Sequence, residues 1–328
     1  INSRGDGTGC QKMKFGIFVE NPEKVSRFLN EASKICAVRT LDYDSSEKIL
    51  DNTVFYMSFA DYLAKKMGLS QEVQRDIIIN SNLIMQRTDE ENDSPYKTFE
   101  YIGKFADYIN RYKGESFSPR VTRYEISGVK ILLIEPQCGS NICVIESGGR
   151  LLFIDSGFRC YKEETLKVLR ELVPGFDGME KLEILTHPDV DHCGLWNIFS
   201  RVYVSRKSYE NYRLEKAGES NLREINPVHL PYIRLSKLLT GYETPALTNL
   251  EVIGGTLSEQ KEPLEYIGDI FFGGLLFKVY EGACGHTHGE IICIEENMKI
   301  AFTGDIYVNI KGFSPEQAEF NRVAPYLM

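Results

Sequence analysis

The sequence predicts a layered α/β domain that follows a mainly helical N-terminal region. From about Val121 onward, short apolar runs with the character of strands alternate with turns and with stretches of helical periodicity. Two pairs of these runs are predicted hairpins, one across Ser147-Gly148-Gly149 and one across residues 295–298. Before about residue 115, apolar residues recur mostly at helical spacing instead.

The N-terminal region carries two helix starts. Asn21-Pro22-Glu23 supplies a capping residue, a proline suited to the first helical position and an acid near the positive end of the helix dipole. Ser70 is predicted to cap a second helix, whose apolar residues also follow helical spacing. The other predicted elements of this region are an apolar run at 14–19, a polar loop at 88–95 and a helix at about 96–112.

Strands and helices alternate in the second region. The predicted strands are residues 141–146, 150–154, 182–185, 203–204, 291–294 and 299–302. Helices are predicted at 162–172 and from a cap at Ser205 to about residue 216. We therefore predict two domains: a mainly helical subdomain at 1–115 and a layered α/β domain at 116–328, the latter with an insertion at about 207–265.

Composition narrows the function classes. The chain has 328 residues, of which 42% are hydrophobic, so it can bury a sizeable core. Acidic residues outnumber basic ones by 47 to 38 and give a formal charge of −9, which disfavours general nucleic-acid binding. A bound dication would offset charge locally, so small anionic substrates stay compatible with this composition.

Cysteine usage and hydropathy indicate the compartment. The eight cysteines form no CxxC pair, and we expect reduced thiols in a cytoplasmic protein. No apolar run approaches the ~18 residues of a membrane span, and the first residues contain no apolar signal core. The expected partners are a small-molecule substrate and, as one use of the N-terminal helices, a second copy of the chain in a homodimer.

The clearest chemical signal is the segment THPDVDHCG at residues 186–194. Four ligand-type side chains lie within six residues and directly follow a predicted strand: His187, Asp189, Asp191 and His192. Imidazole and carboxylate are common ligands of zinc, iron and manganese. The alternative interpretation is a solvated polar loop in which Asp191 caps a following helix.

This segment resembles the HxHxDH signature of the metallo-β-lactamase superfamily, as an HxDxDH variant. Three further segments resemble that family's motifs in the expected order: LLFIDSG at 151–157, GHTHGE at 285–290 and FTGD at 302–305. The resemblance covers roughly residues 121–310. It implies a four-layer αββα sandwich, with two facing sheets, helices outside and the site at one edge.

The resemblance also implies a binuclear metal site. It places His187, Asp189 and His286 on a first metal, Asp191 and His192 on a second, and Asp305 between them. Asp191 is also expected to orient the attacking water or to move its proton. Asp155 is expected to orient the metal-binding loop by hydrogen bonds rather than to bind metal.

Two positions depart from the family pattern. Asp189 stands where most members have His, and an oxygen ligand shifts the expected metals from zinc toward iron or manganese. Residues 306–328 contain no counterpart of the family's late His. We expect that the chain stops short of the family's full domain; the alternative is that another group takes that place.

The remaining candidate residues are not expected to bind metal. His288 is expected to contact substrate or a ligand rather than metal, His229 to be an ordinary loop residue and Cys193 a buried thiol. Tyrosines of the predicted insertion suit a pocket wall and a packed surface equally well; they are Tyr209, Tyr212, Tyr232, Tyr242 and Tyr266.

Three function classes follow from the resemblance. The first is a hydrolase with two divalent metal ions and a metal-bridging hydroxide, acting on a small ester, thioester, lactone or phosphoester. The second is a diiron redox protein that reduces oxygen or nitric oxide, related to the flavodiiron proteins. The third is a metal-bearing sensing or binding module without turnover.

Overall fold

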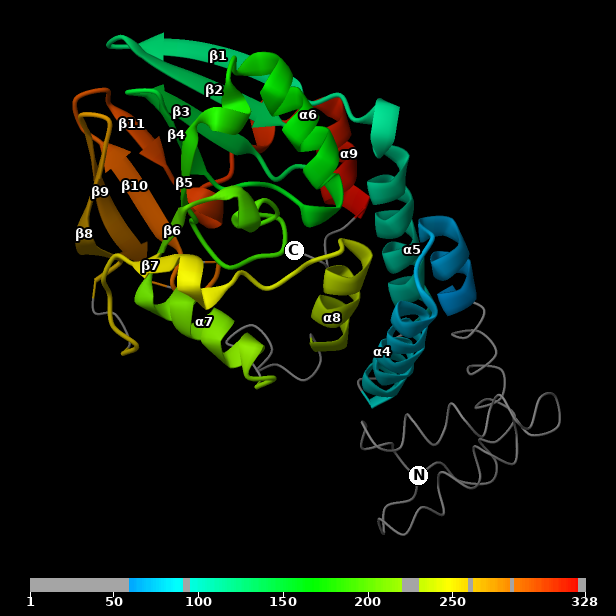
Figure 1. The fold of residues 1–328 in the computed structure, drawn as a ribbon. Helices are drawn as coiled ribbons and strands as arrows, with labels where there is room; N and C mark the ends of the chain where they lie inside the picture. Colours follow the sequence, from blue (N-terminus) through cyan, green and yellow to red (C-terminus); the bar gives the residue numbers. More distant parts are fainter. Residues whose placement is uncertain (1–58, 91–94, 220–229, 259–261, 284–285, 324–328) are drawn as a thin grey trace, which may run out of the picture. The chain divides into compact units, whose positions relative to one another are not determined.

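The computed structural model describes residues 59–90, 95–219, 230–258, 262–283 and 286–323 (Figure 1). Within these ranges the chain divides into two compact units. One holds the residues up to Ala106 together with 230–238, and the other holds residues 107–219, 239–258, 262–283 and 286–323. The predicted domain limits at residues 115 and 116 stay a prediction. All six candidate metal ligands lie in the second unit.

The first unit is helical in its described part. A helix at residues 59–67 is followed by α4 (Gln71–Glu90), and α5 (Pro95–Arg111) begins in this unit. The predicted cap of α4 is confirmed, because Ser70 Oγ accepts a hydrogen bond from the Val73 N–H at 3.3 Å. The apolar run at 14–19 and the helix start at Asn21 lie outside the described residues.

The polar segment at 88–95 differs from the prediction of a loop. Residues 88–90 continue α4, and Pro95 already begins α5. Polar side chains do not by themselves end a helix, whereas glycine and proline do, and proline suits the first position of the next helix. Only residues 91–94 separate the two helices, and they lie outside the described residues.

Two β-sheets face each other in the second unit (Figure 1). The larger sheet has the order β1-β2-β3-β4-β5-β6-β7, antiparallel from β1 to β4 and parallel from β4 to β7. Its strands are Arg120–Ile126, Val129–Glu135, Ile142–Ser147, Arg150–Ile154, Glu180–Ile184, Arg201–Val204 and Leu250–Val252. The smaller sheet is antiparallel, in the order β11-β10-β9-β8, with strands Leu264–Phe272 (β8), Leu275–Gly282 (β9), Ile291–Glu295 (β10) and Ile300–Phe302 (β11).

Side chains on the two faces of the larger sheet belong to two separate hydrophobic cores. On β4, Leu151 and Phe153 belong to a cluster with side chains of α6 (Lys162–Leu172) and with Tyr212 of α7 (Arg206–Lys216). Leu152 and Ile154 point to the opposite face and join a cluster shared with β8, β9 and β10. Because successive side chains point to opposite faces, one short strand contributes to both layers. The fold class predicted from the sequence, a sandwich of two sheets with helices and a helical N-terminal region, is confirmed.

Most predicted elements of this unit lie where the sequence indicated. Both hairpins are present as β3–β4 and β10–β11, and α6 spans the predicted helix. The predicted cap of α7 is confirmed, because Ser205 Oγ accepts a hydrogen bond from the Ser208 N–H at 3.1 Å. The unit also contains α9 (Pro315–Val323), which the sequence did not indicate.

The segment predicted as an insertion, residues 207–265, contributes to the sheet. Its described part holds most of α7, the helix α8 (Leu230–Leu239) and β7, which pairs in parallel with β6. Tyr212 is fully buried in the core, and Tyr209 and Tyr242 pack against it. The packed-surface interpretation therefore holds for these three tyrosines, whereas Tyr266 lies on β8 with 53% of its surface exposed.

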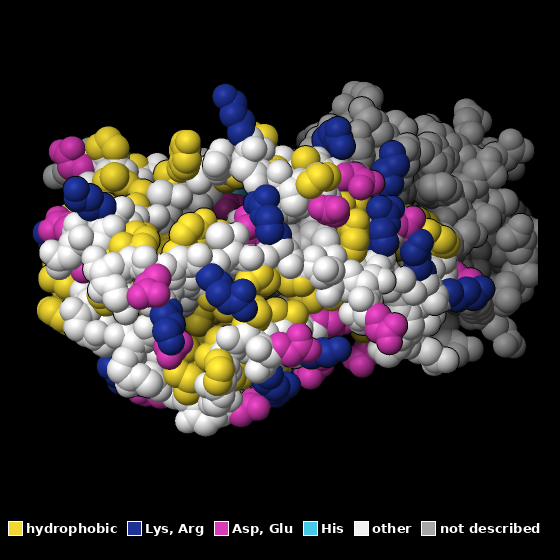
Figure 2. Space-filling view, turned by 90° about the horizontal axis from the view of Figure 1, so that it is seen from above, with side chains coloured by type: hydrophobic (Ala, Val, Ile, Leu, Met, Phe, Trp, Pro, Cys, Tyr) yellow, Lys and Arg dark blue, Asp and Glu magenta, His cyan; other side chains and the backbone are white. Residues whose placement is uncertain are grey.

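The surface mixes apolar and charged side chains. Figure 2 shows hydrophobic side chains that reach the surface in several patches, with acidic and basic side chains between them. Among the described helices, none combines the length and apolar character that a membrane crossing requires.

Replacing a buried aromatic ring should lower the free energy of unfolding much more than replacing an exposed one. Phe153 is fully buried, with its ring centroid 5.0 Å from that of Phe199, so Phe153→Ala should lower the free energy of unfolding by about 3–5 kcal/mol. Phe271 is 72% exposed, and Phe271→Ala should change it by less than about 0.5 kcal/mol. Chemical denaturation of both variants tests the packing, and equal losses would contradict it.

Candidate metal centre

The candidate ligands, and Asp155 beside them, lie just after the ends of strands from both sheets. Asp155 directly follows β4, and His187 lies three residues after the end of the neighbouring parallel strand β5. His286 lies in the turn between β9 and β10, and Asp305 lies in the short turn η7 (Gly304–Ile306) after β11. The Ile291 N–H donates to the Thr186 carbonyl at 2.9 Å, which ties the start of β10 to the end of β5.

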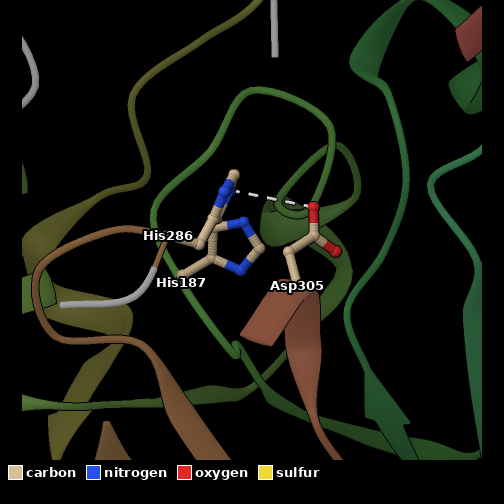
Figure 3. A group of neighbouring side chains, drawn as sticks. All are labelled: His187, His286 and Asp305. Carbon is tan, nitrogen blue, oxygen red and sulfur yellow. Dashed lines mark ion pairs between the residues drawn. The ribbon is translucent and has the colours of Figure 1, made fainter. Parts of the chain in front are cut away.

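Three side chains converge from both sheets. His187, His286 and Asp305 each offer a ligand atom, and these atoms lie within 4.8 Å of one another. Figure 3 shows the two imidazole rings and the carboxylate directed toward a common region, with His286 Nε2 3.7 Å from Asp305 Oδ2. Asp189 lies between the two rings, with its Oδ2 3.4 Å from His187 Nε2 and 3.2 Å from His286 Nε2.

The other two candidates lie beside this group. His192 Nε2 is 3.5 Å from Asp191 Oδ2 and 3.9 Å from Asp305 Oδ2. The ring centroids of His187 and His192 are 4.0 Å apart. Asp305 therefore lies next to both groups, and all six candidate side chains are brought together. Their role as metal ligands stays a prediction.

These separations suit divalent cations. Ligand bonds of about 2.1 Å in a tetrahedral site place neighbouring ligand atoms about 3.4 Å apart. The atom pairs named above span 3.2–3.9 Å. His187 Nε2 is also fully buried and makes no hydrogen bond within the described residues, although a buried nitrogen normally has a partner. The residues present therefore fit the binding of divalent metal.

Asp155 orients both buried histidines, His192 directly and His187 through the Thr186 hydroxyl. Its Oδ1 accepts the Thr186 N–H at 2.8 Å, and its Oδ2 accepts the Thr186 hydroxyl at 2.7 Å and His192 Nδ1–H at 2.8 Å. The Thr186 oxygen in turn accepts His187 Nδ1–H at 2.9 Å. Because both Nδ1 atoms are engaged in this way, the Nε2 atoms are the ones that face the site. This agrees with the positioning role predicted for Asp155.

The carboxylates around His192 change the pKa of its imidazole. Burial by itself lowers the pKa of this imidazole, but the carboxylates of Asp191, Asp155 and Asp305 outweigh burial and raise the pKa well above its usual value. Without a cation, the surrounding acids thus favour a proton on His192. A bound cation would supply the same positive charge.

Glu290 is a buried group that sequence reasoning missed. Its Oε1 accepts the Asp305 N–H at 2.6 Å and lies 3.6 Å from His187 Nδ1. Burial raises the pKa of this carboxyl, against the opposing effect of His187. A side chain at position 304 would meet Glu290 Oε1 at 2.7 Å, and Gly304 has φ +52°, so glycine is required for this approach. The available signal was an acid inside GHTHGE, four residues after His286.

The loop that carries the candidate ligands 187–192 is held by backbone hydrogen bonds against the segment that follows β4. The Ser156 N–H donates to the His192 carbonyl at 2.7 Å, and the Gly194 N–H donates to the Gly157 carbonyl at 2.8 Å. A Cβ at Gly194 would lie 2.5 Å from the Gly157 oxygen, so a larger residue would push these two loop segments apart. Cys193 is fully buried and its thiol contacts the Asp189 carbonyl at 3.4 Å, as expected for a structural thiol.

Of the two other histidine candidates, only His288 lies within the described residues. The His288 side chain is exposed and is not part of the ligand group. His229 lies outside the described residues. Ser140 was not predicted, yet its hydroxyl donates to Asp191 Oδ2 at 3.0 Å. Its only sequence signal was the Gly-Ser turn just before β3.

The centre opens on one side into a cavity of about 580 Å³, a volume usual for small-molecule sites. Asp191, His192, His286 and Asp305 line its inner end. His187 is fully buried, whereas the His286 and Asp305 side chains are 25% and 34% exposed. The arrangement therefore has a closed floor and an accessible face, as a centre that acts on small molecules requires.

Several solved structures are similar to the chain at low identity. A flavo di-iron protein variant from Thermotoga maritima is 14% identical with a TM-score of 0.36, over 57% of this chain and 42% of that one. A metallo-beta-lactamase from Pontibacter korlensis is 14% identical with a TM-score of 0.35, over 63% and 87%. A chemotaxis sensor from T. denticola is 15% identical with a TM-score of 0.35, over 57% and 63%. The chain thus spans less than half the length of the flavo di-iron protein, and TM-scores this low do not separate these functions.

The family comparison is specific. No curated protein sequence matches the chain significantly. The family model described as the metallo-beta-lactamase superfamily matches residues 136–309, more than half of the chain, and this range contains every strand-end motif of the centre. The chain belongs to the metallo-β-lactamase superfamily.

Proposed function

We propose that this protein is a metal-dependent hydrolase with a binuclear centre. The observation that carries the proposal is the convergence of three imidazoles and three carboxylates, with ligand-atom separations that suit two cations. When bound, divalent metals supply Lewis acidity and a water nucleophile at neutral pH. The candidate substrates are small esters, thioesters, lactones and phosphoesters.

Each residue has a role in this proposal. His187, Asp189 and His286 would hold one metal, Asp191 and His192 the other, and Asp305 both. Asp191 Oδ2 accepts a hydrogen bond from Ser140 and borders the cavity, which suits a group that orients water or takes up its proton. Through the histidine Nδ1 contacts, Asp155 would keep the Nε2 atoms directed toward the place where metal would bind.

Asp189 supports iron or manganese as well as zinc. Its carboxylate lies within 3.4 Å of both imidazoles of the first group, so this metal would have an oxygen ligand and a lower net charge. The same observation favours the second candidate function, a diiron redox protein. Hydrolysis remains our first choice because it needs only Lewis acidity, whereas redox turnover also needs a source of electrons.

Metal affinity should depend on His286 and not on the nearby His288. His286→Ala removes a nitrogen from the ligand group and should lower metal affinity by at least roughly 10–100-fold. His288→Ala is the matched control, because this exposed histidine lies in the same turn and should leave affinity unchanged. Metal analysis and titration of the folded variants give the comparison. Equal affinities for the two variants would contradict the assignment.

Removing the charge of Asp155 should weaken metal binding without unfolding the chain. Asp155 has φ +59°, a conformation that asparagine also tolerates, so Asp155→Asn preserves the backbone. The amide binds the imidazole Nδ1–H less strongly than the carboxylate does, and we expect roughly 10–100-fold weaker metal affinity. Circular dichroism controls for folding. Unchanged affinity would show that the histidines do not need this carboxylate.

Activity should separate hydrolysis from redox chemistry. Protein of measured metal occupancy should hydrolyse members of a panel of activated esters and phosphodiesters, and should consume negligible oxygen with generic electron donors. Asp305→Ala should reduce hydrolysis by more than roughly 100-fold, because both metals lose a ligand. Asp269→Ala, at an exposed position on β8, is the control. Rapid reduction of oxygen or nitric oxide without hydrolysis would replace our first choice by the diiron alternative.

A further inference from the structure

The cavity beside the metal centre extends away from the ligands toward α9. Beyond the metal-binding side chains, it is lined by Leu133 of β2, by Val308, Ile310 and Phe313 of the segment after Asp305, and by Phe320 of α9. Ile310 is 67% exposed and Val308 44%, so apolar side chains also form the mouth. Exposed apolar side chains at a cavity mouth are typical of surfaces that bind apolar groups.

Two of the polar side chains that line the cavity, Gln317 and Ser140, are hydrogen-bonded within the protein. The Gln317 amide donates to the Pro136 carbonyl at 2.9 Å and to Asn141 Oδ1 at 3.0 Å, and its oxygen accepts the Ser314 N–H at 3.3 Å. The Ser140 hydroxyl donates to Asp191. Gln317 and Ser140 therefore stiffen the wall, and their donors are already used within the protein.

Positive charge is absent from the described lining. None of the described residues that form the cavity wall is lysine or arginine, whereas Asp155, Asp191 and Asp305 are acids. Carboxylates and phosphates in protein sites are normally bound by arginine or lysine. Among the side chains that line the cavity, a second anionic group on a substrate would find no cationic partner and would lose its hydration there. Lys311 lies in the same segment as Ile310, but it is exposed and does not line the cavity.

We infer that the substrate is a neutral acyl compound, represented here by a carboxylic ester, whose uncharged, apolar arm occupies the outer part of the cavity. The inference rests on the proposed function and selects one class among its candidate substrates. In the reaction, water adds its hydroxyl to the acyl carbon, the bond from that carbon to the alcohol oxygen breaks, and the alcohol leaves with the remaining proton. Ile310, Val308 and Phe313 then determine specificity by contact with the arm.

The first test compares p-nitrophenyl esters that differ only in the arm. From acetate to butyrate to hexanoate, kcat/KM should rise by up to about fourfold per added methylene, as each buries further apolar surface. The p-nitrophenyl monoester of adipate matches hexanoate in carbon number but ends in a carboxylate, and it should be at least tenfold poorer. A preference for the adipate monoester, or no dependence on arm length, would overturn the inference.

A charge introduced at the mouth should reverse this preference. Ile310 is largely exposed, so Ile310→Lys places a cation beside the arm without burying it, and the adipate monoester should gain on hexanoate by at least fivefold. Leu257→Lys is the matched control, because Leu257 is 60% exposed and does not line the cavity. An identical ratio in wild type, Ile310→Lys and Leu257→Lys would show that position 310 does not contact the arm.

A binding experiment separates failure of the inference from failure of the proposed function. Hexanamide and adipamate share an amide head and differ in the end of the chain, and neither requires turnover. In NMR titrations of metal-loaded protein, hexanamide should bind more tightly than adipamate, and Ile310→Lys should reverse the order. If this order is found without hydrolysis of any ester, the apolar arm site stands and the hydrolase proposal falls. Tighter binding of adipamate to wild type overturns the inference. Turnover of phosphodiesters alone also overturns it, but leaves the proposal of a metal-dependent hydrolase in place.

Discussion

The candidate centre depends on one buried carboxylate, that of Asp155. A charge removed from water is costly unless it is hydrogen-bonded, and Asp155 meets this requirement with three donors from Thr186 and His192. These donors lie on the segment after β5, so the same interactions that stabilise Asp155 fix the ends of β4 and β5 together. Both buried histidines receive their orientation from this group, His192 directly and His187 through the Thr186 hydroxyl.

The second sheet completes the centre because several contacts hold its loops against the first sheet. The Ser205 and Ser208 hydroxyls both donate to the Gly289 carbonyl, at 2.7 and 3.2 Å, which fixes the turn that carries His286. A buried ion pair of 2.6 Å between Lys207 and Glu281 joins α7 to the end of β9 nearby. These elements are far apart in the sequence, so the positions of His286 and Asp305 relative to His187 follow from the packing of the sandwich.

Sequence reasoning succeeded where a local pattern had a local cause. The hairpins, the helix α6 and the caps at Ser70 and Ser205 follow from turn residues, apolar periodicity and side-chain hydrogen bonds within a few positions. The sequence did not indicate elements that depend on contacts with residues far away in the chain. The segment at 207–265 contains β7, a strand of only three residues that is stabilised by pairing with β6 rather than by its own sequence pattern.

The sequence by itself determined the ligand-type side chains, their order along the chain and their attachment to strand ends, because these are properties of short motifs. Only the tertiary structure decided which imidazole nitrogen faces the centre, that Glu290 meets Asp305, and that the residues of α9 and of the segment at 308–313 that line the cavity include no lysine or arginine. Each of these features is a contact between segments that the packing of two sheets brings together, and no periodicity or spacing within one segment records it.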